Sequence, residues 1–162
     1  MWRELIVLSG ALIGLAGVEL SQQEKAGVSG EDVIAARQES MDMSTIAIGS
    51  MREAMRAGRE AKAEAYPAAA LAKWAKVLPK TFPAGTGAGE SSADSQALSA
   101  IWRDRVGFDQ AASDFADATA RLSALAVANE TAAFTKQLDE VKRACNSCHG
   151  RYKAGAQGPP AK

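Results

Sequence analysis

The chain has only one histidine and two cysteines among its 162 residues. A structural zinc site needs four Cys or His ligands, so this scarcity excludes one. A dithiol redox site usually lies near a βαβ pattern, which the sequence does not show. Basic and acidic residues number 19 each and leave no net charge, so we expect no binding to nucleic acid. Aromatic and β-branched residues are few and alanine is abundant, which favours helices over sheets.

The three rare residues lie together near the C-terminus, in the stretch Cys145-Asn146-Ser147-Cys148-His149. C-x-x-C-H is the attachment motif of a c-type haem. The two thiols form thioether bonds with the haem vinyl groups, and the histidine binds the iron as its proximal ligand. Residues three and four apart share one face of a helix, so Cys145, Cys148 and His149 point the same way. A structural disulfide is a poor alternative, because the loop that it would close is tiny.

The longest apolar run, Leu5 to Val18, is shorter than the ~20 residues of a membrane-spanning helix. It follows a short head that carries Arg3 and is typical of the apolar region of a secretory signal peptide. We therefore predict that residues 1–20 are a signal peptide. The cleavage signal at Gly14 and Ala16 is weak, so an uncleaved N-terminal anchor is a second interpretation, and a buried helix is a third.

Four amphipathic helices are predicted after a linker over residues 21–30, at Glu31 to Gly58, Glu60 to Leu78, Ile101 to Ala128 and Glu130 to Lys153. Ser29 can accept hydrogen bonds from the first turn of the first helix. Asn129 is expected to end the third helix and to cap the fourth. The apolar spacing places Tyr66 and Val77 on the inner face of the second helix and Val106 on that of the third.

These helices predict an all-α fold, an antiparallel up-and-down four-helix bundle over residues 31–154. An irregular stretch over residues 80–95 joins the second and third helices, and a flexible tail covers residues 155–162. The cysteines continue the apolar stripe of the last helix, so an attached haem would lie against the bundle interior. Small alanine faces leave room there for a flat macrocycle that leucine would exclude.

Several segments resemble the cytochrome c′ family, the class II c-type cytochromes. They are Arg37-Gln38 followed by Met41, LPKTFPAGTG over residues 78–87, Ile101-Trp102 leading to Phe108, and the C-terminal CNSCHGRYK. The resemblance covers about Glu31 to Lys153. It implies one covalent haem c on Cys145 and Cys148, with His149 as the axial iron ligand. It also implies a homodimer through the first two helices. Export to the periplasm agrees with it, because bacteria attach c-type haem outside the cytoplasm.

Two charged residues need separate comment. The resemblance places Arg37 near a haem propionate, where a guanidinium suits a carboxylate; the alternative is a solvent-exposed helix residue. Family members commonly carry arginine four residues after the haem histidine, whereas this chain has Lys153. Lysine keeps the positive charge but loses the planar guanidinium. Inferences about gas binding on the side of His149 therefore do not carry over from the family.

No nucleophile–base pair, carboxylate dyad or phosphate-binding loop is visible, so we do not expect an enzyme. Two functions remain for a haem protein. One is electron transfer to redox partner proteins, with iron ligated by His149 and Met41. The alternative is a five-coordinate, high-spin cytochrome c′ that binds nitric oxide or carbon monoxide. A helical interaction domain with a chance motif is a third and weaker interpretation.

Met41 is the candidate for the second iron ligand because it lies on the apolar stripe between Ile34 and Ile48. Met43 points about 200° away from that stripe. Met51 and Met55 lie at least ~15 Å further along the helix. The alternative for Met41 is a core filler, since methionine fits irregular gaps well. Ligation by Met41 with electron transfer is our main interpretation, and gas binding is the alternative.

Overall fold

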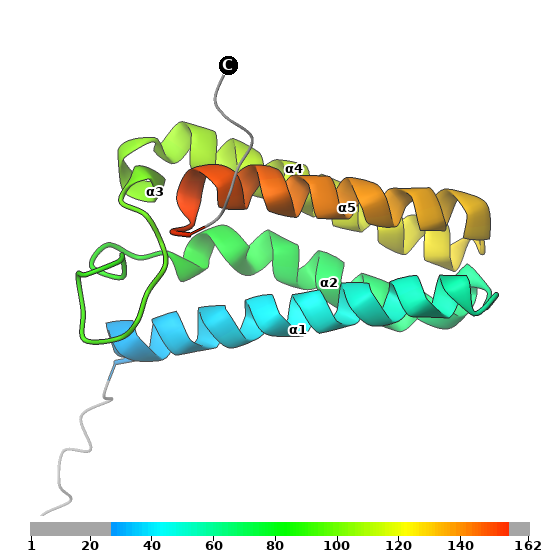
Figure 1. The fold of residues 1–162 in the computed structure, drawn as a ribbon, viewed down its shortest axis with the longest axis horizontal. Helices are drawn as coiled ribbons and strands as arrows, with labels where there is room; N and C mark the ends of the chain where they lie inside the picture. Colours follow the sequence, from blue (N-terminus) through cyan, green and yellow to red (C-terminus); the bar gives the residue numbers. More distant parts are fainter. Residues whose placement is uncertain (1–26, 156–162) are drawn as a thin grey trace, which may run out of the picture.

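The computed structural model of the protein describes residues 27–155. In this region the chain forms the predicted all-α bundle, with four long helices that run up and down (Figure 1). The long helices are α1 (Gly30–Arg56), α2 (Ala65–Val77), α4 (Arg105–Val127) and α5 (Thr131–Tyr152). The short segments are η1 (Ala61–Glu64), η2 (Leu78–Thr81) and α3 (Ala100–Arg103).

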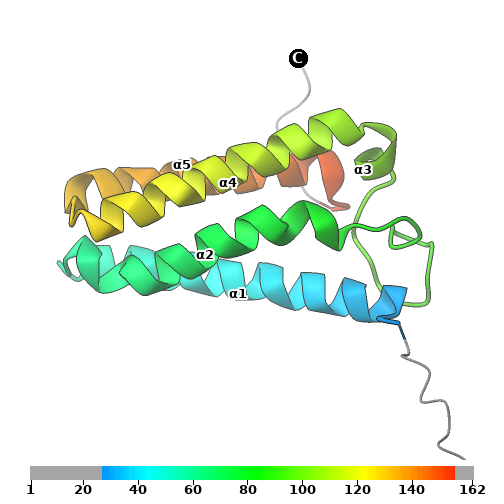
Figure 2. The ribbon, with the colours of Figure 1, turned by 180° about the vertical axis from the view of Figure 1, so that it is seen from behind.

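Helix α4 forms the centre of the packing, because it runs along both α2 and α5. Figure 2 shows α2 and α4 from behind, with the loop between η2 and α3 at the same end of the bundle as the start of α1. The core between α2, α4 and α5 consists of large apolar side chains, which include Leu71, Phe108, Phe115, Leu122, Phe134, Leu138 and Val141. Helix α1 is held more loosely than the other three.

Helix α1 is buried at its two ends only. Ile34 and Arg37 are buried near its start, and Met51 and Ala54 near its end. No residue from 38 to 50 is buried. The first turn of α1 has the cap that the sequence predicts. The Ser29 hydroxyl accepts from the Asp32 amide at 3.0 Å, and the Asp32 carboxylate accepts from the Ser29 amide at 3.1 Å. The central part of α1 therefore faces something other than the bundle core.

The third predicted helix is interrupted at Asp104, which separates α3 from α4. The Asp104 carboxylate caps α4 by accepting from the Gly107 amide at 3.1 Å. The prediction for Val106 is wrong, because this side chain is 84% exposed. The helix begins anew at Arg105, so the apolar register before Asp104 does not continue onto the same face of α4.

The predictions for Tyr66 and Val77 on the second helix, and for Asn129 as a cap of the fourth, are also wrong. Tyr66 is 86% exposed, and Val77 is exposed as well, because three alanines and Leu71 form the buried face of α2. Asn129 ends α4 with φ 57°, but it does not cap α5. Its side-chain oxygen instead accepts from the Lys62 amide at 2.9 Å.

Three predictions fall partly or wholly outside the described residues. They are the signal peptide or anchor over residues 1–20, most of the linker over residues 21–30, and the tail over residues 155–162 beyond Gly155. Just before that tail, the Ala154 amide donates to the Gln96 carbonyl at 2.8 Å. Among residues 27–155, no helix is long and apolar enough to cross a membrane.

Candidate haem site

A cavity of about 790 Å³ lies between α1, α5 and the chain around Ala97. Its size falls in the range of ~300–1,000 Å³ that is typical of cofactor pockets. The central part of α1 that is not buried lines one side, with Met41, Thr45 and Ile48 among its residues. Apolar side chains of the core line a further part: Leu78, Phe82, Ile101, Phe108 and Phe115. The cavity explains why α1 has no buried residue between positions 38 and 50.

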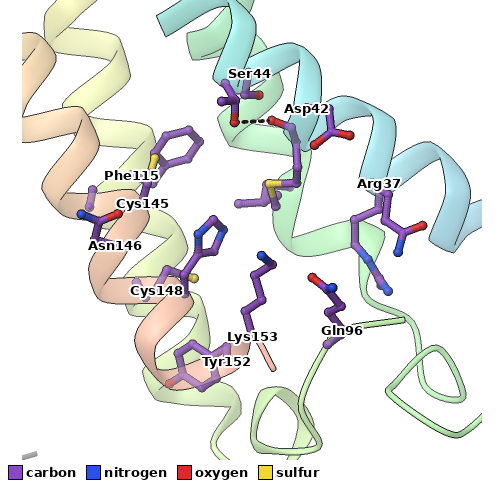
Figure 3. A pocket seen from close by; sticks show the side chains of 18 of the residues that line it. Arg37, Asp42, Ser44, Gln96, Phe115, Cys145, Asn146, Cys148, Tyr152 and Lys153 are labelled. Carbon is purple, nitrogen blue, oxygen red and sulfur yellow. Dashed lines mark hydrogen bonds between the residues drawn. The ribbon is translucent and has the colours of Figure 1, made fainter. Parts of the chain in front are cut away.

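Cys145, Cys148 and His149 all line this cavity from the last turns of α5. Figure 3 shows both cysteines on the helix wall beside it. Both thiols are free, so the disulfide alternative is not formed. Burial and the neighbouring Cys148 raise the pKa of Cys145 to about 11. Burial also raises the pKa of Cys148. The cavity therefore receives two uncharged sulfur atoms, three residues apart.

His149 presents a neutral imidazole to the same cavity. Burial, and to a smaller extent the Lys153 ammonium, lower the pKa of His149 below its ordinary value of 6.5. A neutral imidazole keeps the nitrogen lone pair that a metal ion needs. Lysine at position 153, where the family pattern has arginine, lines the cavity as well.

Arg37 is only 4% exposed and lines the opposite edge of the cavity. Its Nη1 donates to the Thr81 carbonyl at 2.9 Å and to Thr86 Oγ1 at 3.1 Å. Its Nη2 donates to the Thr86 carbonyl at 3.0 Å and to Ser95 Oγ at 3.1 Å. The guanidinium also lies 4.3 Å from the centre of the Phe82 ring. This burial excludes the solvent-exposed alternative.

The charge of Arg37 is not balanced by the protein. Within residues 27–155, no acidic side chain lies within 4.0 Å of its guanidinium. Burial lowers the pKa of Arg37 because the charged form loses water. Buried charges in proteins are normally paired. The arrangement therefore fits a carboxylate that enters the cavity from outside the chain.

Met41 is the one methionine of the described region that lines the cavity. Met43 is 63% exposed, and Met51 is fully buried in the core. Met55 does not reach the cavity lining. The helix geometry assumed from the sequence therefore holds for all four side chains. Whether the Met41 sulfur binds iron stays a prediction.

The donor set fits a covalent haem c. It combines two thiols, a neutral imidazole, an apolar wall and a buried unpaired cation, which match the vinyl groups, iron, macrocycle and propionates. Sequence reasoning missed Gln96, which also lines the cavity, and Asp104, which contacts the end of α5. Nothing in the local sequence marks either residue, because their partners lie about fifty residues away.

A helical bundle with this cavity defines a monohaem c-type cytochrome. A family model described as "Cytochrome C'" matches residues 32–153. The chain therefore belongs to the cytochrome c′ family, and its cofactor is one covalently attached haem c.

Individual relatives agree with this assignment. The chain is 37% identical over 84 residues to cytochrome c-554 of Cereibacter sphaeroides, which covers 51% of this chain and 62% of that protein. It is 33% identical over 87 residues to cytochrome c′ of Rhodospirillum rubrum, which covers 54% of this chain and 57% of that protein. It thus spans less than two thirds of either relative.

Among solved structures, the fold matches a cytochrome c′ with an unusual ligand-controlled dimer dissociation. The TM-score is 0.73, with 23% identity, over 80% of this chain and 99% of that one. At this identity the match supports the fold alone.

Proposed function

We propose that this cytochrome c′ binds a diatomic gas, nitric oxide or carbon monoxide, on the side of the cavity formed by α1. Membership of the cytochrome c′ family supports gas binding over the Met-ligated electron carrier, so we prefer the alternative to our main interpretation. The observation that carries the proposal is the open wall of α1. No residue from 38 to 50 is fully buried, and this wall of the cavity faces α5, which leaves space there for a small ligand.

The residues of this chain divide the work of holding the cofactor. Cys145 and Cys148 would carry the thioether bonds, and His149 would ligate the iron. When bound, the haem supplies an iron centre that can take up a gas or change its oxidation state. Phe108, Phe115 and the other apolar side chains of the wall give the macrocycle an apolar surface to lie against. Arg37 supplies positive charge at the polar edge. This role is binding and not catalysis.

Electron transfer is the second candidate, and one observation favours it. Met41 is the only methionine of the described region on the cavity wall, and a thioether is a competent soft ligand for haem iron. Bonding between iron and Met41 would close the site that a gas needs. The two candidates therefore make opposite predictions for the same side chain.

The optical and electron paramagnetic resonance spectra of Met41→Leu test the proposal. We expect high-spin ferric iron and ready binding of nitric oxide both in the natural protein and in Met41→Leu. Met43→Leu is the matched control, because Met43 is exposed on the same helix. A low-spin spectrum with the absorption band of an iron–methionine bond, lost only in Met41→Leu, would establish electron transfer instead.

We further propose that the protein is exported to the periplasm by residues 1–20. The support is the apolar run Leu5 to Val18 and the requirement of c-type haem for attachment outside the cytoplasm. The intact mass of the haem-bearing product distinguishes a cleaved signal from an uncleaved anchor. A haem-bearing product found only in the cytosol would overturn both versions.

A homodimer through α1 and α2 is also proposed. Met43 and Ile46 on α1 are 63% and 61% exposed, and Tyr66 and Val77 on α2 are exposed too. Large apolar side chains exposed on this pair of helices suit a protein interface. The cytochrome c′ of similar fold whose dimer dissociates under ligand control supports a second copy of this chain as the partner.

A further inference from the structure

The segment that follows His149 is fixed at the edge of the cavity by backbone pairing. Ala97 and Lys153 form an antiparallel bridge. The Leu98 amide donates to the Tyr152 carbonyl at 2.9 Å, and the Ala154 amide donates to the Gln96 carbonyl at 2.8 Å. Gln96 and Lys153 are therefore adjacent, although they lie far apart in the sequence. The pairing holds both side chains at one place on the cavity edge.

Both side chains line the cavity together with Arg37. Figure 3 shows Arg37, Gln96 and Lys153 on the same side of it, with the Lys153 side chain extending inward. Three groups that donate hydrogen bonds, two of them cationic, thus gather on one edge.

The charges on this edge are unbalanced. The acidic residues of the lining, Glu39 and Asp42, both lie on α1. Within residues 27–155, neither Arg37 nor Lys153 forms an ion pair, whereas the lining residue Arg52 is paired with Asp139 at 2.8 Å. The edge therefore carries two free positive charges, which would balance the negative charges of two carboxylates.

Arg37 alone cannot supply the donors that two carboxylates need. A guanidinium has five N–H groups, and the two Nη atoms of Arg37 already donate to Thr81, Thr86 and Ser95. Only Nε remains. An ammonium offers three N–H groups and a glutamine amide offers two. Lys153 and Gln96 therefore hold the donors that Arg37 lacks.

We propose that Arg37, Gln96 and Lys153 together form the binding site for both haem propionates. Arg37 holds one carboxylate through its charge and Nε, and Lys153 with Gln96 holds the other. The expectation from the family resemblance involved Arg37 alone. The inference depends on the haem and not on the choice between gas binding and electron transfer.

Infrared difference spectra between oxidised and reduced protein test the site. The full-length holoprotein is produced with haem that carries ¹³C in both propionate carboxyl groups, so that their bands are identified by the isotope shift. We expect Lys153→Met to move the band of one propionate, Gln96→Leu to move the same band less, and Lys153→Arg to retain it. Both side chains are exposed, so these substitutions remove little packing.

Lys142→Met is the control, because Lys142 also lines the cavity but belongs to the preceding turns of α5. The propionate bands of the Lys142→Met protein should stay where they are in the natural protein. The reduction potential alone does not discriminate, since Lys153→Met and Lys142→Met each remove a positive charge near the iron. Bands that are identical in Lys153→Met and the natural protein would overturn the site. A shift in Lys153→Met without one in Gln96→Leu would remove Gln96 from it. Nitric oxide binding, measured separately, tests the proposed function.

Discussion

The Tyr152 hydroxyl donates a 2.8 Å hydrogen bond to the Asp104 carboxylate, which joins the end of α5 to the start of α4. The same carboxylate accepts from Arg151 Nη2 at 2.8 Å and from the Gly107 amide at 3.1 Å. A Cβ at position 107 would collide with the Asp104 carboxylate, so glycine allows this close approach. One acidic residue thus fixes the helix end that carries the haem motif.

Tyr152→Phe should destabilise the protein, because it removes the hydroxyl and leaves the ring packed. The ring lies 5.4 Å from that of Phe108 in an edge-to-face arrangement. Hydrogen bonds to charged acceptors exceed neutral ones in strength. We expect a fall of a few degrees in the midpoint of thermal unfolding. Tyr66→Phe is the control with the same chemical change, and an equal effect of both substitutions would contradict the role of the hydrogen bond.

Acid should loosen the same corner. The hydrogen bonds from Tyr152 and Gly107 hold the pKa of Asp104 below its ordinary value of 3.8. A carboxyl whose pKa is lower in the folded state stabilises the protein above its unfolded pKa, and this contribution is lost as the pH falls through the folded pKa. Stability measured between pH 5 and 2, roughly the range in which carboxyl groups titrate, should therefore fall less steeply in Asp104→Asn. Parallel curves would contradict this assignment.

Arg37→Met should destabilise the bundle by at least about 2 kcal/mol, because it removes the hydrogen bonds from the Arg37 guanidinium to Thr81, Thr86 and Ser95. Urea unfolding of the holoprotein measures the change. Arg56→Met on the same helix is the control, since the Arg56 side chain is 73% exposed. Surface substitutions of that kind stay within about 0.5 kcal/mol. A similar cost for both substitutions would show that the Arg37 contacts are not stabilising.

Removal of the attachment residues should change how the haem is held. Cys145→Ser and Cys148→Ser should each leave one thioether and lower the yield of holoprotein, and His149→Ala should remove the proximal ligand. A pyridine haemochrome spectrum and the protein mass after denaturation measure covalent haem. Ser147→Ala, within the same motif, should leave both unchanged. Haem that resists acid–acetone extraction when both cysteines are replaced would refute the assignment.

Met43→Glu and Ile46→Glu should weaken the proposed dimer, because each places a charge on its apolar face. Analytical ultracentrifugation of the holoprotein measures the dissociation constant, which we expect to rise at least about tenfold, equivalent to ~1.4 kcal/mol. Val127→Glu on α4 is the control, since Val127 is also exposed. A dissociation constant unchanged by the α1 substitutions would place the dimer contact elsewhere.

Features encoded by neighbouring residues were predictable from the sequence. The haem motif occupies five consecutive residues, and the cap of α1 depends on Ser29 and Asp32, three positions apart. The stripe that brings Met41 to the cavity follows from helix geometry alone. These predictions needed no knowledge of how the helices pack, which explains why the helix start and the all-α bundle were predicted correctly.

Features that depend on distant contacts were not predictable. The break at Asp104 is stabilised by Tyr152 and Arg151, 48 and 47 positions away, and the wrong orientation predicted for Val106 follows from that break. The partners of Arg37 come from a loop that has no periodic pattern. Gln96 became visible as a cavity residue only through its pairing with the chain beyond His149.

The haem motif lies on the last helix, which has a consequence for biosynthesis. Chains are made from the N-terminus at about 5–20 residues per second, so α1 to α4 leave the ribosome before α5. The core residues Phe134, Leu138 and Val141 all belong to α5. Until those residues emerge, the face of α4 that packs against α5 has no partner to cover it. The haem-binding helix is therefore also the helix that completes the core.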